Sequence, residues 1–166
     1  HAIFRYEREH TANESTYWLR FELLWREYFR WYSRASDWTL FRRSGPNDKE
    51  LPGDHNMTRF ESWKTGHTDC DIVDAAMREL HQTGWISNRA RQLVASHLIY
   101  ELNLDWRLGA SYFESQLVDF DAASNWGNWA YIAGVGPDPR GGRIFNLNDQ
   151  ADRYDPDQSY RRRWLS

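Results

Sequence analysis

The stretch from Ser87 to Leu102 reads SNRARQLVASHLIYEL, and it decides the fold class. Polar residues stand at its start, and an apolar run from Leu93 to Ile99 follows them. Because a helix repeats every 3.6 residues, positions i, i+3, i+4 and i+7 share one face. The residues at that spacing are Asn88, Arg91, Gln92 and Ala95. We predict a helix over residues 87–102 that carries polar side chains among apolar neighbours.

A longer helix is predicted upstream, over residues 15–33. No Gly or Pro interrupts this stretch, and Asn13 and Ser15 are residue types that cap the amino ends of helices. A second set of residues falls at the same helical spacing and shares a face. Its members are Glu22, Trp25, Arg26 and Phe29.

The rest of the chain is also predicted to be helical or irregular. One helix is expected over residues 72–82, with Asp71 as its cap and Gly84 just past its end, and another over residues 110–120. Residues 44–56 form a loop rich in Gly, Pro, Asn and Asp, and residues 125–142, with five glycines and two prolines, form a structured loop or short turns. Residues 148–166 are expected to be partly helical. Because we find neither strand alternation nor an internal repeat, we predict an all-α fold in one domain, residues 1–166.

The composition fits one domain of 166 residues with a core of its own. Ten tryptophans are far above ordinary usage, and a Trp ring serves stacking, cofactor contact and electron transfer as well as packing. The formal net charge of −3 does not give the whole chain the basic character of a typical nucleic-acid binder. Arginine clusters at residues 42–43 and 161–163 form either a local basic face or ordinary solvated surface.

The cysteine content and the lack of long apolar runs indicate the compartment. Cys70 is the only cysteine, so no internal disulfide can form and a reducing compartment is expected. No apolar run reaches the ~20 residues that span a bilayer, and no signal peptide is visible. The chain begins at His1 and not at Met, which suggests a fragment, a processed chain or a trimmed one. We expect a cytoplasmic protein (organellar or nuclear in a eukaryote) that is not secreted and has no membrane partner.

Familiar catalytic patterns are missing from the sequence. The six histidines show no metal-ligand spacing, so no metal site is expected. We find neither a Gly-x-Ser-x-Gly elbow nor a phosphate loop ending in Gly-Lys-Ser/Thr. The remaining candidates for a functional site are polar residues that stand among apolar ones in the predicted helices. Burying a carboxylate costs free energy unless it is paired with a positive charge. We therefore expect Arg91 to pair with Asp119 or Asp121, either in a functional site or in a salt bridge that only holds helices together.

The same positions resemble the flavin-binding domain of the photolyase and cryptochrome family. The sequence segments that match are residues 13–18, 21–29, 73–80, 87–92, 105–109, 119–125, Trp129 with 131–136, and 143–146. They occur in the family's order over residues 12–164. The DASH branch of the family is the one that the chain resembles at Gln92, at Tyr131 and in the motif Asn-Trp-Gly-Asn-Trp at residues 125–129.

The resemblance implies FAD as the cofactor and gives individual residues roles around it. Asn125 would face N5 of the isoalloxazine ring, Arg91 and Asp119 would pair beside the flavin, and Asp121 would bind its polar edge or ribose. Trp85 would border the adenine pocket, and Trp129 and Trp106 would be the two inner tryptophans of an electron relay. The residues implied to contact the cofactor are Trp85, Asn88, Arg91, Asp119, Asp121 and Asn125.

The resemblance also implies DNA as the substrate. A pyrimidine dimer flipped out of the strand would be stacked and hydrogen-bonded in the cleft, with Glu22 and Asn88 supplying polar contacts. The implied contacts to DNA are Glu22, Trp25, Arg26, Gln92, Tyr131, Arg143 and Gln150. The implied reaction is a light-driven electron transfer from reduced FAD that splits the cyclobutane ring, with Glu22, Asn88, Trp106 and Trp129 as its catalytic residues. Members of the DASH branch favour single-stranded DNA.

The chain also departs from the family pattern. Gly53 stands where the outer tryptophan of the relay belongs, ten residues before Trp63, so Trp31, Trp38 or Trp126 would have to substitute for it. Asp69 and Asp71 replace the usual Gly and Pro. The family's loop that cradles the FAD phosphates and its antenna domain, which binds a pterin such as methenyltetrahydrofolate, lie upstream of this sequence. We therefore expect a missing antenna domain or a complementary chain as a partner.

Two other functions remain open. A cryptochrome photoreceptor would use the same flavin for signalling without repair, and photoreceptors often retain the residues of the lesion pocket. A helical scaffold that binds no flavin is the other alternative, because the phosphate-binding loop is missing. The complete set of Arg91, Asp119, Asp121 and Asn125 favours a flavin site over the scaffold.

Overall fold

The computed structural model describes residues 2–138 and 140–166. The elements run in the order α1 (Ala2–His10), α2 (Glu14–Ser36), the 3₁₀-helix η1 (Asp37–Phe41), α3 (Met57–Thr65), α4 (Asp71–Thr83), α5 (Asn88–Ser96), the π-helix η2 (His97–Glu101), α6 (Trp106–Gln116), α7 (Ala122–Ala133), α8 (Leu147–Tyr154) and α9 (Ser159–Leu165). The only β-type pairing in this part of the chain is an isolated bridge between Asp54 and Leu104. The predicted all-α class is confirmed.

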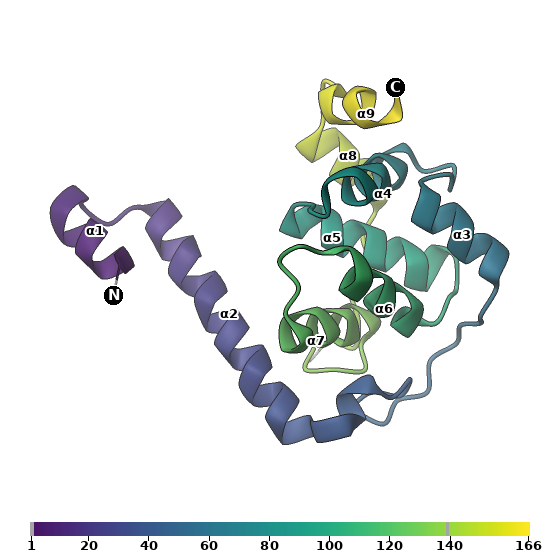
Figure 1. Ribbon diagram of the computed structural model, residues 1–166, viewed down its shortest axis with the longest axis horizontal. Coiled ribbons are helices and arrows are strands. Elements are labelled where there is room, and N and C mark those ends of the chain that lie inside the picture. The colour runs from purple at the N-terminus through teal and green to yellow at the C-terminus, as the bar shows by residue number, and fades with distance from the viewer. Residues whose placement is uncertain (1, 139) are drawn as a thin grey trace.

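Helices α3 to α7 gather into one body, and α2 runs along its side (Figure 1). The carboxyl-terminal half of α2 packs against α7, whereas its amino-terminal half and α1 extend away from the body. Helices α8 and α9 lie at the opposite end, where α9 packs on α4. The body therefore meets the long helix α2 mainly at α7.

The predicted helices over residues 15–33 and 87–102 are present. Asn13 is the cap of α2: its side chain accepts a hydrogen bond from the backbone N–H of Thr16, and the Thr16 hydroxyl accepts one from the backbone N–H of Asn13. Ser87 caps α5 in a similar way by accepting from the N–H of Ala90. The last turn of this second helix widens into the π-helix η2. The partly helical end is also confirmed, as α8 and α9.

Three predicted boundaries are wrong. The helix expected over residues 110–120 is α6, which begins at Trp106 because the Asp105 carboxylate caps it and which ends at Gln116. Asp71 is the first residue of α4 and not its cap, which is Cys70. Gly84 ends α4 in the left-handed conformation, as expected.

The largest error is at residues 125–142, where helix α7 replaces the first part of the expected loop. Asp121 caps this helix, and Gly134 ends it with a positive φ of 76°. Gly127 lies inside the helix, where its missing side chain lets the Phe29 ring of α2 approach: a Cβ there would overlap that ring. Gly127 is thus a packing position and not a helix breaker. Helices α1, α3 and η1 were not predicted either.

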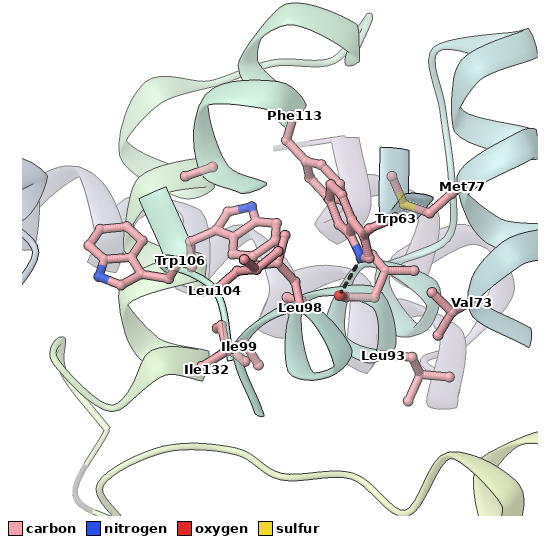
Figure 2. Close-up of a cluster of buried hydrophobic side chains, with 14 of the residues drawn as sticks. Trp63, Val73, Met77, Leu93, Leu98, Ile99, Leu104, Trp106, Phe113 and Ile132 are labelled. Carbon is pink, nitrogen blue, oxygen red and sulfur yellow. Dashed lines mark hydrogen bonds between the residues drawn. The ribbon is translucent and has the colours of Figure 1, made fainter. Parts of the chain in front are cut away.

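The core is rich in tryptophan (Figure 2). Trp63 and Trp106 are fully buried, and the Trp63 indole Nε1 donates to the Val94 carbonyl at 3.0 Å. The Trp106 indole donates to the Arg43 carbonyl, also at 3.0 Å. Because both indole N–H groups are paired, the two large rings are buried without an unsatisfied donor.

A buried carboxylate ties the loop before α3 to the start of α6. The Asp105 carboxylate, which has no exposed surface, accepts from the Arg107 guanidinium at 2.6 Å and from the His55 Nε2 at 3.1 Å. Burial alone would raise the pKa of Asp105, but the hydrogen bonds from Arg107 and His55 and the Arg107 charge outweigh it and lower that pKa to about 2. The loop is thereby fixed against the helix that supplies one wall of the site.

Helix α2 exposes large apolar side chains on several faces. Leu24 is 68% exposed and Trp31 65%, and other exposed side chains of this helix are Tyr17, Trp18, Leu19, Phe21, Leu23 and Tyr28. Exposed apolar surface of this extent usually marks a site where another segment or molecule packs. No helix in the described part of the chain is long and apolar enough to cross a membrane.

Candidate functional site

A cleft lies between α2, α5 and α7. Its inner hollow, of about 100 Å³, lies between α5, α6 and α7, and it opens into an outer cleft of about 770 Å³ that α2 and Arg143 complete. The outer cleft by itself has the volume of a small-molecule site, and the inner hollow extends it into the body. The residues that line both are Asn88, Arg91, Gln92, Asp119, Asp121, Ser124, Asn128 and Ile132.

Asn125 stands in the wall of the inner hollow with its amide held in one orientation. It lies on α7 and is buried, and its Nδ2 donates to the Ala110 carbonyl of α6 at 2.9 Å. Its Oδ1 accepts no hydrogen bond from the described residues, and the side chain lines the hollow. This amide oxygen is therefore available to accept from an N–H group inside the hollow.

Asp121 caps α7 and is held as a carboxylate. It accepts from the Ser124 N–H at 2.9 Å and from the Ser124 hydroxyl at 2.7 Å. Burial opposes ionisation, but these two bonds and the charges of Arg30 and Arg26 lower the pKa of Asp121 below its usual value. The cap thus places a fixed negative charge at the rim of the inner hollow.

Arg91 pairs with Asp119, one of the two partners that the sequence left open. One guanidinium nitrogen, Nη2, lies 2.9 and 3.1 Å from the two carboxylate oxygens, and Nε donates to the Ile86 carbonyl at 3.0 Å. The expectation of a buried pair is wrong, because the side chains of Arg91 and Asp119 are 26% and 48% exposed. The pair lies at the rim of the cleft, where water screens it.

The floor of the inner hollow is aromatic. The Trp129 ring lies 5.2 Å from that of Phe113 and 6.2 Å from that of Trp63. Gly109 of α6 lets Trp129 approach, because a Cβ at Gly109 would overlap the indole ring. Trp106 is buried outside the hollow, and its ring lies 5.7 Å from that of the half-buried Trp126.

The outer cleft has an aromatic and basic wall. The rings of Trp25 and Tyr131 are 6.1 Å apart at an interplanar angle of 68°, and the Arg143 guanidinium carbon lies 5.0 Å from the Tyr131 ring centroid. Arg143 also donates to the Tyr131 hydroxyl. Glu22 and Arg26 are exposed on the α2 side of this cleft.

The structure thus gathers most of the expected site residues into one cleft, which is lined by Glu22, Trp25, Arg26, Asn88, Arg91, Gln92, Asp119, Asp121, Asn125, Trp129, Tyr131 and Arg143. Three are placed elsewhere. Trp85, 48% exposed, lines a separate hollow beside α9, Trp106 lies in the core, and Gln150 lies on α8 with its Oε1 buried and unpaired.

Sequence reasoning missed several residues that shape this cleft. Ser124 holds the Asp121 carboxylate, Gly109 makes room for Trp129, and Asn128 lines both hollows. Ser124 could have been found, because it stands three residues after an Asp at a helix start. The contact between Gly109 and Trp129 had no local signal.

Comparisons with known proteins agree with this arrangement. Residues 18–166 match the family described as the FAD binding domain of DNA photolyase. The chain is 54% identical to a cryptochrome DASH of Vibrio parahaemolyticus, over 99% of its own length and 37% of that protein's length. It is 48% identical to the chloroplastic/mitochondrial cryptochrome DASH of Oryza sativa, over 98% of its own length and 28% of that protein's length.

Solved structures show the same fold. A Synechocystis cryptochrome superposes with a TM-score of 0.95 at 50% identity, over 99% of this chain and 34% of that one. An archaeal photolyase from Sulfolobus tokodaii, whose structure is described with two FAD molecules, gives a TM-score of 0.85 at 35% identity. The match covers 99% of this chain and 37% of that one. The chain spans about a third of the length of these relatives. It belongs to the photolyase and cryptochrome family, as part of the helical FAD-binding domain, and shares about half of its residues with cryptochromes of the DASH branch.

Proposed function

We propose that this chain is the flavin-binding part of a blue-light-driven DNA photolyase of the cryptochrome DASH type. In this proposal the isoalloxazine ring of FAD reaches into the inner hollow, and a pyrimidine dimer in single-stranded DNA enters the outer cleft. The single observation that carries it is Asn125, whose amide is held by the Ala110 carbonyl and which lines a hollow bordered by Trp129 and by Arg91 with Asp119.

The residues of the inner hollow fit the ring system of a flavin. A flavin ring is planar and apolar on its faces but carries N–H and C=O groups along its edges. The hollow offers apolar walls from Phe113, Leu117 and Ile132, together with polar groups from Asn88 and Asn125. A pocket of this kind, mostly apolar with a few convergent polar groups, is typical of cofactor sites.

Each polar residue of the inner hollow has a definable part in holding the cofactor. The Asn125 Oδ1 would accept from a ring N–H, and Arg91 would bring a positive charge to the ring edge while Asp119 fixes its orientation. Asp121 would accept from a hydroxyl or N–H group at the rim. When bound, reduced FAD supplies the light-excited electron that splits the dimer, and the protein contributes orientation, charge and exclusion of water.

The residues of the outer cleft suit an extruded base. Trp25 and Tyr131 offer inclined aromatic faces for stacking, whereas Glu22, Gln92 and Asn88 offer hydrogen-bond groups for the base edges. Arg26 and Arg143 bring positive charge for the DNA backbone, as phosphate contacts require. Beneath them, Trp129 and Trp106 would carry electrons to the flavin, and Trp126 continues that row of rings toward the surface.

We also propose that a further part of the protein completes this site. The chain spans about a third of its relatives, and helix α2 exposes many large apolar side chains, which usually pack against another segment. The added segment would supply backbone donors for the FAD pyrophosphate. An antenna domain with a pterin would belong to the full-length protein, in the cytoplasm or, in a eukaryote, in an organelle or the nucleus.

A dimer-repair assay tests this function. The chain is mixed with reduced FAD and a single-stranded oligonucleotide that contains one thymine dimer, and the recovery of thymine absorption is followed under blue light and in the dark. We expect light-dependent repair that falls at least tenfold in Glu22→Gln and stays unchanged in Glu14→Gln, an exposed acid of the same helix. Flavin binding without any repair would instead support the photoreceptor function.

A further inference from the structure

Asp138 is a buried carboxylate in the turn that follows α7. Its side chain has no exposed surface, and its two oxygens accept from the backbone N–H groups of Arg140 and Gly142, each at 3.1 Å. Residues 140–143 are thereby drawn back toward the end of α7. The backbone N–H of Arg143 then donates to the Ile132 carbonyl at 2.9 Å.

The turn places Arg143 in the wall of the outer cleft. Its Nε lies 3.8 Å from the Asp138 Oδ2, which is a charge contact and too long for a hydrogen bond. That Nε is buried without a hydrogen-bond partner in the described structure, while the guanidinium covers the Tyr131 ring and donates to its hydroxyl. The Asp138 carboxylate is therefore the negative charge that lies beside the buried Nε.

Gly142 shows how tightly this turn is folded. Its φ is +128°, a conformation that favours glycine, and a Cβ there would overlap the Tyr100 hydroxyl. That hydroxyl donates to the Ile132 carbonyl at 2.8 Å, the same carbonyl that accepts from Arg143. The position of Arg143 is thus fixed by the backbone on one side and by Asp138 on the other.

We propose that Asp138 is a positioning residue for DNA binding: it orients Arg143 over Tyr131 and so sets the wall that faces Trp25. The inference rests on the proposed function, because that wall is assigned there to the DNA strand. Asp138 itself lines neither hollow of the cleft. It acts only through Arg143 and Tyr131.

The direction of the change in DNA affinity distinguishes a positioning role of Asp138 from an effect of its negative charge alone. Removing a negative charge near a polyanion should strengthen binding if only the overall field matters. Asp138→Asn keeps the side-chain shape but loses one acceptor for the backbone and the charge beside the Arg143 Nε. If Asp138 positions Arg143, the same variant weakens binding instead.

The first test is the affinity for a single-stranded oligonucleotide with one thymine dimer, measured over a range of salt concentrations. We expect Asp138→Asn to raise Kd roughly fivefold and to reduce the salt slope by about one phosphate contact, as Arg143→Ala should. The double variant should add nothing to Arg143→Ala. Asp152→Asn, which removes an exposed acid from α8, should leave binding equal or tighter. Unchanged or tighter binding by a folded Asp138→Asn chain would overturn the proposal.

A second measurement needs neither DNA nor a stable variant. In the NMR spectrum of the wild-type chain, the Arg143 Nε–H group should exchange slowly with water, together with the amides of Arg140 and Gly142. Exchange at the rate of an exposed arginine would refute the positioning role. A wild-type chain that binds no oligonucleotide would refute the proposed function, and the Arg143 exchange rate would then still decide the role of Asp138.

Discussion

Replacing Asp105 by Asn should change how the unfolding free energy depends on pH, by an amount that follows from the contacts of the Asp105 carboxylate. The Asp105 carboxylate is buried between Arg107 and His55, and its pKa falls from 3.8 to about 2. At about 1.4 kcal/mol for each pKa unit, this drop corresponds to about 2 kcal/mol of unfolding free energy. The same carboxylate caps α6, the helix whose Ala110 carbonyl holds Asn125.

The sign follows from proton linkage. A carboxyl group with a lowered folded-state pKa stabilises the protein above its unfolded-state value, and this contribution is lost as the pH falls toward the folded-state pKa. For Asp105 the contribution is complete above about pH 5 and is lost progressively as the pH falls to about 2. Asp105→Asn cannot titrate, and it leaves Arg107 without its partner, which should cost about 2–3 kcal/mol at pH 7.

Urea unfolding followed by circular dichroism at pH 7, 5, 3 and 2 measures both effects. The difference in unfolding free energy between wild type and Asp105→Asn should shrink by about 2 kcal/mol between pH 5 and pH 2. Asp152→Asn, an exposed acid without a described partner, is the matched control and should follow the wild type. A difference that stays constant from pH 7 to pH 2 would refute the assignment of this stabilisation to the Asp105 carboxylate.

Four further predictions follow from the site. Asn125→Asp should change which flavin redox states accumulate under blue light, and unchanged absorption spectra would contradict its place beside the ring. Arg91→Ala should weaken flavin binding but cost only about 1 kcal/mol in urea unfolding, because its pair with Asp119 is partly exposed; a loss of several kcal/mol would show that the pair is buried. Trp106→Phe should slow flavin photoreduction in transient absorption while flavin affinity stays unchanged, and an equal rate would exclude it from the relay. Gly109→Val should lower the unfolding free energy by about 1–3 kcal/mol, and a chain of wild-type stability would show that Trp129 does not need this close approach.

The sequence could predict what depends on neighbouring residues along the chain. The shared face of Asn88, Arg91 and Gln92 follows from helical spacing, and all three line the cleft. The cap at Asn13 and the end of α4 at Gly84 are also local signals, and both were predicted. Fold class and a large part of the site were accessible for this reason.

The sequence could not predict what depends on contacts between distant segments. Gly127 looked like a helix breaker because the Phe29 ring that it accommodates comes from another helix. Spacing alone could not decide whether Arg91 pairs with Asp119 or Asp121, since both lie in the short connection between α6 and α7. Asp138 stands in a segment rich in Gly and Pro, and its burial appears only once the turn is folded.

The most direct test of the central claim is an equilibrium titration of FAD with this chain, followed by flavin fluorescence and absorption. If the inner hollow holds the isoalloxazine ring, the wild-type chain quenches the flavin in a saturable way and shifts its absorption bands. Asn125→Leu, which fills the hollow and removes the amide, should raise Kd at least tenfold, whereas Asn148→Leu, an exposed amide on α8, should not. A wild-type chain that leaves the FAD spectrum unchanged, or that binds FAD equally well after Asn125→Leu, would contradict the account.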